Sequence, residues 1–184
     1  MMSALKSLTA ARTDVGVKSL AVLRITTGLL FLWAFADKAF GLGYATQSQN
    51  AWFSGGSPTK GFLSRVSVGP LESTFHELAG AWWADTLFML GLFAVGVALV
   101  LGIGLRIAAV TGVLMMLLMW IAEWPPAQHN SAGEPTMSTN PLIDYHVVYA
   151  VVLVVLAATA SGVTWGLARQ WSGLPFVQAN PWLQ

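Results

Sequence analysis

The chain contains no cysteine and little charge for its length. Only 9% of its 184 residues are charged, whereas soluble domains carry about 25%. The missing cysteines exclude disulfides, thiolate metal sites, iron–sulfur ligation and a thiol nucleophile within this chain. With 55% hydrophobic residues and a net charge of +1, the chain cannot coat a globular surface with charge, and it offers no basic surface for nucleic acid. We therefore expect a multi-pass membrane protein of one domain, in contact with the lipid bilayer.

Histidine is also scarce, and motifs for cofactors are missing. Of His76, His129 and His146, only His146 adjoins an apolar segment, so a bis-histidine haem is not expected. The sequence has no nucleophile elbow, no phosphate-cradling loop and no metal-ligand spacing. We accordingly expect no metal site and no intrinsic haem or flavin.

Four apolar segments are long enough to cross a bilayer, which takes about 20 residues. They cover approximately residues 19–38, 82–104, 107–122 and 141–165. The sequence thus predicts an all-α four-transmembrane-helix bundle with a tail at 1–16 and outer loops at 39–81 and 123–140. Within the first loop, "PLESTFHELAGAWW" has the spacing of a short surface helix.

The positive charges predict the orientation of the bundle. Five of them fall on one side of the predicted spans: Lys6, Arg12, Lys18, Arg106 and Arg169. The loops on the other side contain only Lys60 and Arg65. Because cytoplasmic loops carry an excess of Lys and Arg, we expect both termini to be cytoplasmic and the protein to lie in the plasma membrane.

Helical spacing in the first span places several polar groups on shared faces. Lys38 lines up with Phe31, Thr27 and Arg24, whereas Asp37 lines up with Trp33. Ionisable groups within spans usually point into the bundle and are candidates for function. Alternatively, Lys38 extends to the headgroups, and Arg24 bridges helix ends or lipid phosphates.

Each predicted outer helix end supplies at least one ionisable group. The candidate catalytic set is Asp37, Lys38, Asp85, Glu123, Asp144 and His146, and the candidate ligand-binding set is Arg24, Thr27, Phe31, Trp33, Trp120 and Tyr149. This layer is either an aromatic belt with interfacial charges or an outward-opening polar pocket. In "TNPLIDYHVVY", we expect Asn140 to cap the last helix, with Pro141 as its first residue.

The segment "LRITTGLLFLWAFADKAFGLG" resembles the first helix of the DoxX family, in which an Arg, a Gly-x-x-Phe step and an outer Lys recur. "NPLIDYHVVYAVVLVVLA" and "WGLARQW" resemble the last helix and tail of that family, and "SPTKGFL" and "GIGLRIAA" are similar to one of its branches. The resemblance extends from Leu23 to Trp171. It implies a four-helix membrane bundle related to the DoxD-type subunit of thiosulfate:quinone oxidoreductase. It also implies that Arg24 and Lys38 match recurring basic positions and that Asp144 and His146 match the polar start of the last helix.

Three functional hypotheses follow. The first is a subunit of a membrane redox complex that interacts with quinone through an outer polar pocket, where Lys38 or His146 donates a hydrogen bond and a carboxylate relays protons. In this case, any oxidoreductase activity requires a partner subunit. The second is a non-catalytic subunit or assembly factor that docks onto a respiratory or redox complex. The third is a small-solute transporter, although the chain shows no inverted repeat.

Overall fold

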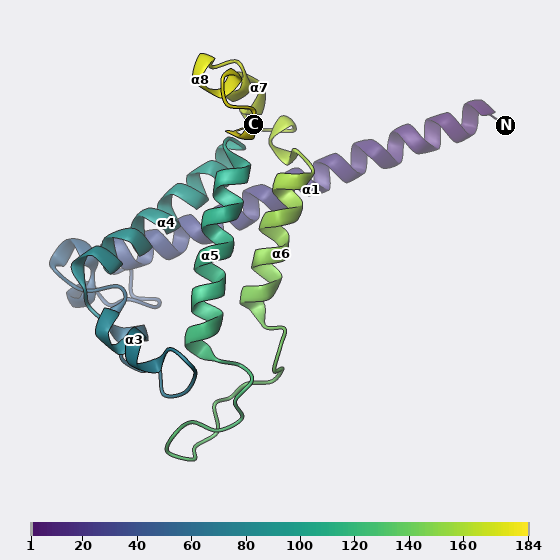
Figure 1. Ribbon diagram of the computed structural model, residues 1–184. Coiled ribbons are helices and arrows are strands. Elements are labelled where there is room, and N and C mark those ends of the chain that lie inside the picture. Colours follow the sequence, from purple (N-terminus) through teal and green to yellow (C-terminus); the bar gives the residue numbers. More distant parts are fainter. Residues whose placement is uncertain (1, 184) are drawn as a thin grey trace.

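The computed structural model describes the backbone of residues 2–183 and the side chains of residues 13–183. The predicted tail at 1–16 therefore lies partly outside the described side chains, and so do its cations Lys6 and Arg12. The long helices are α1 (Met2–Phe40), α4 (Trp82–Leu101), α5 (Leu105–Glu123) and α6 (Tyr145–Ala158) (Figure 1). Among the described residues there is no strand, only one isolated bridge between His129 and Pro135. The all-α prediction is confirmed.

Three helices are long and apolar enough to cross a membrane: residues Thr13–Phe40 of α1, together with α4 and α5. Helix α6 is apolar but has only 14 residues, or about 21 Å of helix. The predicted fourth span at 141–165 is therefore too long at both ends. It ends early because Ala160 adopts a left-handed conformation with a φ of 47° and the Ser161 hydroxyl donates to the Leu156 carbonyl.

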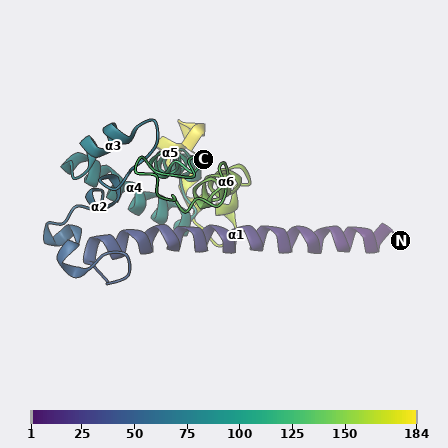
Figure 2. The same ribbon diagram turned by 90° about the horizontal axis from the view of Figure 1, so that it is seen from below.

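The helices pack as consecutive neighbours, α1 against α4, α4 against α5 and α5 against α6 (Figures 1 and 2). Glycine allows the backbones to approach closely. A Cβ atom added at Gly28 of α1 would lie 2.8 Å from the Val100 backbone nitrogen of α4. One added at Gly112 of α5 would lie 2.5 Å from the Leu153 side chain of α6. These glycines fix the spacing between the helices that carry the candidate site residues.

The side chains separate into an apolar core and an apolar outer surface. The core contains Phe31, Met89, Leu99, Met116 and Leu153, which are all buried. Large apolar side chains also cover the outer faces of the helices, among them Leu29, Leu87, Val110, Leu114 and Val151. Soluble proteins rarely expose continuous apolar surface of this extent, so contact with a lipid bilayer accounts for it.

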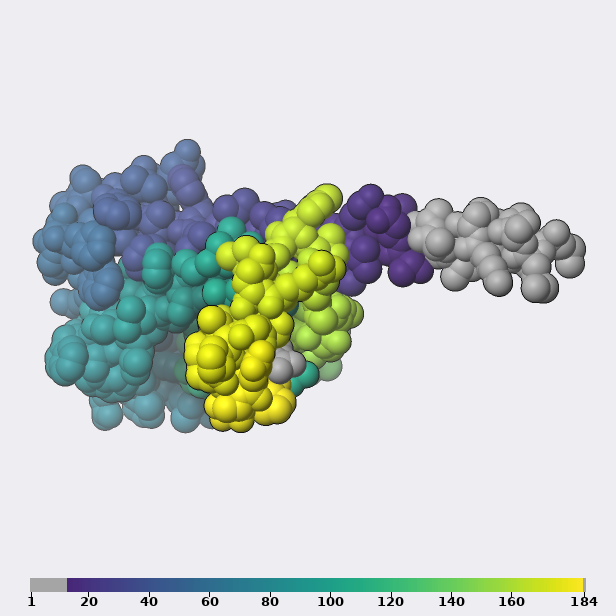
Figure 3. All heavy atoms as spheres, turned by 90° about the horizontal axis from the view of Figure 1, so that it is seen from above, coloured from purple at the N-terminus to yellow at the C-terminus, as the bar shows by residue number. Residues whose placement is uncertain are grey.

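The two ends of the bundle differ in structure. At one end lies the loop 41–81, with the 3₁₀ turns η1 (Ser48–Asn50) and η2 (Trp52–Ser54) and the helices α2 (Lys60–Leu63) and α3 (Glu72–Leu78). The short surface helix predicted there is α3. The other end carries the tight α4–α5 turn and the segment with η3 (Ser161–Val163), α7 (Ala168–Ser172), α8 (Pro175–Gln178) and η4 (Pro181–Leu183). Figure 3 shows this C-terminal segment covering that end. That this end faces the cytoplasm stays a prediction.

Candidate functional site

His146 lies at the start of α6, in a hydrogen-bonded turn that Asp144 organises. Asp144 is the N-cap of this helix, because its Oδ1 accepts from the Val147 backbone N–H at 3.2 Å. Its Oδ2 lies 2.8 Å from Nδ1 of His146. The imidazole is only 1% exposed. The Asp144 carboxylate therefore both starts the helix and fixes the orientation of the His146 ring.

The prediction that Asn140 caps this helix is wrong. The Asn140 side-chain oxygen instead accepts from the backbone N–H groups of Leu142 and Ile143, at 2.9 and 3.0 Å. These bonds form a turn before the helix. Asp144 then takes the cap, because it can accept the bond from Val147 and pair with His146 at the same time.

Glu123 extends the polar group from the end of α5. Its Oε1 accepts from the Tyr145 hydroxyl at 2.7 Å, and its Oε2 lies 4.0 Å from Nδ1 of His146. The Tyr145 ring lies against the imidazole, with 4.0 Å between the ring centroids. Glu123 is more exposed than Asp144. Polar groups are therefore present from the buried imidazole to the surface, with a gap of 4.0 Å between Nδ1 of His146 and the Glu123 carboxylate.

His146 also lines an apolar groove between α5 and α6. The groove has a volume of about 480 Å³ and is lined mainly by aliphatic side chains, including Val113, Met116, Val151 and Val154. Trp120 from α5 lies in the same lining. Because Val151 and Val154 are more than half exposed, the groove opens at the side of the bundle.

Two ring nitrogens of this groove are buried without any hydrogen-bond partner, Nε2 of His146 and Nε1 of Trp120. A buried polar group without a partner costs about 1–3 kcal/mol. The indole N–H can only donate. The carboxylate of Asp144 can only accept, so Nδ1 of His146 is the donor of that pair and Nε2 carries the lone pair of the neutral ring. The groove therefore presents one donor and one acceptor in an apolar setting.

Glu123, Asp144 and His146 also have the composition of a metal site. One ligand atom from each lies within 4.8 Å of the others. In the observed arrangement, however, Nδ1 is committed to Asp144 and one Glu123 oxygen to Tyr145. The group is thus arranged as two neighbouring hydrogen-bonded pairs, Asp144 with His146 and Glu123 with Tyr145. Carboxylates beside an imidazole are a combination suited to proton transfer.

Asp37 and Asp85 lie elsewhere and hold the loop 41–81. Asp37 is 2% exposed, and its oxygens accept from the backbone N–H groups of Tyr44 and Ala45. Oδ1 of Asp85 accepts from the Ser57 hydroxyl and from both the N–H and the hydroxyl of Thr59. These two predicted catalytic carboxylates anchor the loop to α1 and α4.

Arg24 is fully buried at the opposite end of the bundle. Its Nη1 donates to the carbonyls of Leu99 and Val100 at the end of α4. Its Nη2 donates to the carbonyls of Thr164 and Trp165, at 3.1 and 3.0 Å. Helix C-termini leave carbonyls unsatisfied and carry partial negative charge. Arg24 therefore joins α1, α4 and the chain beyond α6, which is the helix-bridging alternative considered for it.

The remaining predicted ligand-binding residues do not meet at one place. The Thr27 hydroxyl donates to the Leu23 carbonyl of its own helix, and Phe31 belongs to the core. Trp33 is half exposed and packs edge-on against Tyr44. Tyr149 packs near Tyr145, with 6.3 Å between the ring centroids. Of the twelve predicted site residues, the structure groups Glu123, Asp144 and His146 with Trp120 and Tyr149 beside them.

Tyr145 was not in either predicted set, although its hydroxyl donates to Glu123 and its ring lies against His146. The only sequence signal for Tyr145 is its position next to His146. This signal is weak, because neighbouring helix residues do not normally face each other. The aliphatic residues of the groove carry no such signal at all. In comparisons with protein-family models, curated proteins and solved structures, no match to this chain was found.

Proposed function

We propose that this chain is the quinone-interacting membrane subunit of a redox complex, as in the DoxX-like reading of its sequence, and that the groove between α5 and α6 is the quinone site. One observation carries the proposal. Two buried ring nitrogens without partners, on His146 and Trp120, line a single apolar groove. Ligand sites are typically apolar cavities with a few convergent polar groups.

The residues of the groove fit a quinone in both of its parts. A head group with oxygen atoms at the ring edge can accept from Nε1–H of Trp120 and, as a quinol, donate to Nε2 of His146. The aliphatic lining continues to the exposed side of the bundle through Val151 and Val154, where an isoprenoid tail can pass into lipid. When bound, the quinone supplies the two-electron redox chemistry.

The chain itself contributes a path for the proton. Nε2 of His146 can take a proton from a bound hydroxyl, because Asp144 stabilises the imidazolium through Nδ1. The Glu123 carboxylate lies 4.0 Å from Nδ1, the nitrogen from which the imidazolium can release its other proton, and is partly exposed. It can therefore pass the proton to solvent. In this proposal a partner subunit delivers the electrons, because this chain has no cysteine for an iron–sulfur cluster and its sequence has no motif for a flavin or a bis-histidine haem.

The experiment is a quinone titration of the purified protein in neutral nanodiscs. Trp120→Phe removes the N–H donor but keeps an aromatic ring, and His146→Leu removes the acceptor. Each is expected to weaken binding about tenfold, corresponding to the loss of about one hydrogen bond inside an apolar site. Trp33→Phe is the matched control, because Trp33 is half exposed and lies outside the groove. If Trp120→Phe and His146→Leu both bind quinone as the parent does, the groove is not the site.

A second candidate is a non-catalytic subunit or assembly factor of a respiratory or redox complex. It is favoured by Arg24, Asp37 and Asp85, whose hydrogen bonds are all made within the chain. Exposed indoles such as Trp82 and Trp165 would supply its docking surface. Co-purification in mild detergent distinguishes the two proposals: this candidate requires stable partner subunits together with no quinone binding by the isolated chain.

A further inference from the structure

Lys38, near the end of α1, lies between two cavities of opposite character. The first, here called the polar cavity, has a volume of about 690 Å³ and is lined mostly by the loop 41–81. The second, the apolar cavity, has a volume of about 480 Å³ and lies between the loop and helices α4 and α5. Lys38 and two loop residues, Pro58 and Phe62, line both cavities. Both volumes fall in the range of about 300–1,000 Å³ that is usual for ligand sites.

The polar cavity concentrates positive charge. Its lining contains Lys38, Lys60 and Arg65 but no Asp or Glu. Among the described residues, neither lysine ammonium forms an ion pair. Nε of Arg65 donates to the Gly61 carbonyl at 2.6 Å, which orients the guanidinium and leaves its other N–H groups available. The side-chain amide of Asn50 adds a neutral donor.

The nearby carboxylates, Asp37 and Asp85, do not line the polar cavity. Asp37 immediately precedes Lys38 in the sequence, but both of its oxygens accept from the backbone N–H groups of Tyr44 and Ala45. Asp85 accepts three hydrogen bonds from Ser57 and Thr59. An anion in this cavity would therefore meet three cations and no facing acid.

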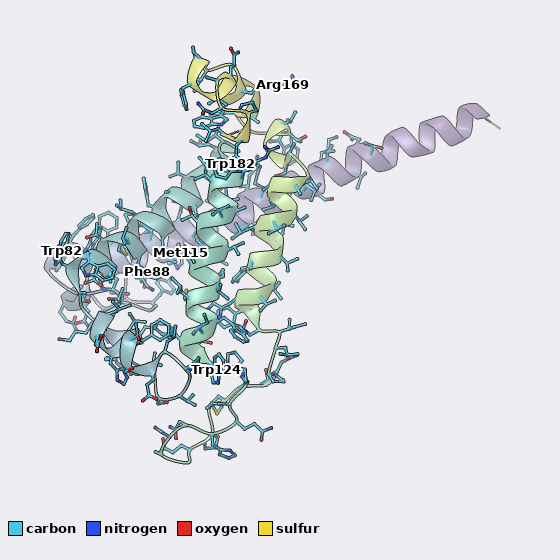
Figure 4. The ribbon with its side chains drawn as sticks, viewed as in Figure 1. Trp82, Phe88, Met115, Trp124, Arg169 and Trp182 are labelled. Carbon is cyan, nitrogen blue, oxygen red and sulfur yellow. The ribbon has the colours of Figure 1, made fainter. Side chains whose placement is uncertain are left out.

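The apolar cavity is almost entirely hydrocarbon and aromatic. Phe62, Leu63 and Phe75 close it from the loop side. Phe88 of α4 and Met115 of α5 line it from the helices, and Figure 4 shows these two side chains between α4 and α5. Except for Lys38, no charged side chain lines it.

We propose that this pair of cavities binds an anionic amphiphile, with the anionic head in the polar cavity and a hydrocarbon chain in the apolar cavity. Lys38 lies at the junction, where its ammonium can contact the head while its methylene stem borders the chain. The site is independent of the proposed quinone groove, since the cavities share no lining residue with it and use a different face of α5.

The experiment measures binding of three probes to the full chain in uncharged detergent. Hexadecanoate carries both head and chain, hexadecanol carries the chain without the charge, and inorganic sulfate carries the charge without the chain. We expect hexadecanoate to bind at least tenfold more tightly than either of the others. Each methylene added between decanoate and hexadecanoate should raise the affinity by up to about fourfold, and added salt should lower it.

Two variants and one control locate the site. Lys38→Met and Lys60→Met keep an unbranched side chain without its charge, and each is expected to weaken hexadecanoate binding about tenfold. Arg169→Met is the control, because Arg169 belongs to α7 at the other end of the bundle (Figure 4). Helical circular dichroism establishes that each variant is folded, and Lys60, which is exposed, keeps the test valid if Lys38→Met does not fold.

Three results would overturn the proposal. Equal binding of hexadecanol would show that the cations take no part. Sulfate binding as tightly as hexadecanoate would identify a site for a free anion only. Hexadecanoate binding that is unchanged in Lys60→Met and in a folded Lys38→Met would place the amphiphile elsewhere on the apolar surface.

Discussion

The two ends of the helix bundle differ in how far their buried side-chain nitrogens are hydrogen-bonded within the chain. At one end, the two Nη atoms of Arg24 donate to four backbone carbonyls and join three parts of the chain, and only its Nε has no partner. At the other end, His146 and Trp120 each leave a buried ring nitrogen without a partner. Within a bilayer, water is scarce and an unsatisfied polar group is costly. Arg24 is therefore a mainly structural group, whose two Nη atoms are bonded within the fold, whereas the groove of the candidate site has a donor and an acceptor that a ligand can pair with.

The largest expected effect on stability is at Arg24. Arg24→Leu should lower the free energy of unfolding by about 3 kcal/mol or more, because four carbonyls would lose a charged donor. Denaturant unfolding in detergent measures the change. Arg106→Leu is the matched control: its guanidinium is exposed and makes one bond, to the Pro181 carbonyl at 3.3 Å. Equal stability of the two variants would contradict the role assigned to Arg24.

The next effect concerns the close packing beside Arg24. Gly28→Ala should destabilise the protein by about 1–3 kcal/mol, because the new Cβ would lie 2.8 Å from the backbone nitrogen of Val100. On the same helix, a Cβ at Gly16 would meet nothing within 4 Å. Gly16→Ala should therefore be neutral or stabilising by up to about 1 kcal/mol. Thermal unfolding of the pair tests whether α1 and α4 are as close as described.

A smaller and more local effect is expected at the loop anchors. Asp85→Asn should cost about 1–2 kcal/mol, because a neutral amide accepts weaker hydrogen bonds from Ser57 and Thr59 than a carboxylate does. Hydrogen exchange should accelerate at the Thr59 amide and in the segment around it. It should stay unchanged at the start of α6, where Asp144 forms an independent cap. Faster exchange at both places would mean that the anchors are not local.

The smallest effect on stability is expected at the candidate site itself. His146→Leu removes an unpartnered nitrogen together with the pair to Asp144, so the two changes should nearly cancel, within about 1 kcal/mol. Its effect on quinone binding should nevertheless be the larger one. This pattern, in which quinone binding is weakened and stability is kept, differs from the large loss of stability expected for Arg24→Leu. A loss of stability as large as that of Arg24→Leu would make His146 a structural residue.

Several local features could be predicted because they depend on neighbouring residues alone. The stripe of Arg24, Thr27 and Phe31 follows from 3.6 residues per turn, and all three side chains are buried. Helices α4 and α5 lie within a few residues of their predicted bounds. The predicted N-cap of α6 was wrong. Asn140 and Asp144 are both good cap residues, and the choice between them depends on where His146 packs.

By itself, the sequence determined that the chain is helical, apolar and suited to a bilayer, because these properties are sums over local residues. Only the tertiary structure decided how the ionisable layer is divided. The helix on which Asp37 and Lys38 sit does not reveal that one holds a loop and the other borders two cavities. Likewise, the predicted helices do not reveal that His146 shares a groove with Trp120 and not with Lys38. The physical reason is that a hydrogen bond or a cavity requires two surfaces, and the pairing of surfaces is set by packing between segments far apart in the chain.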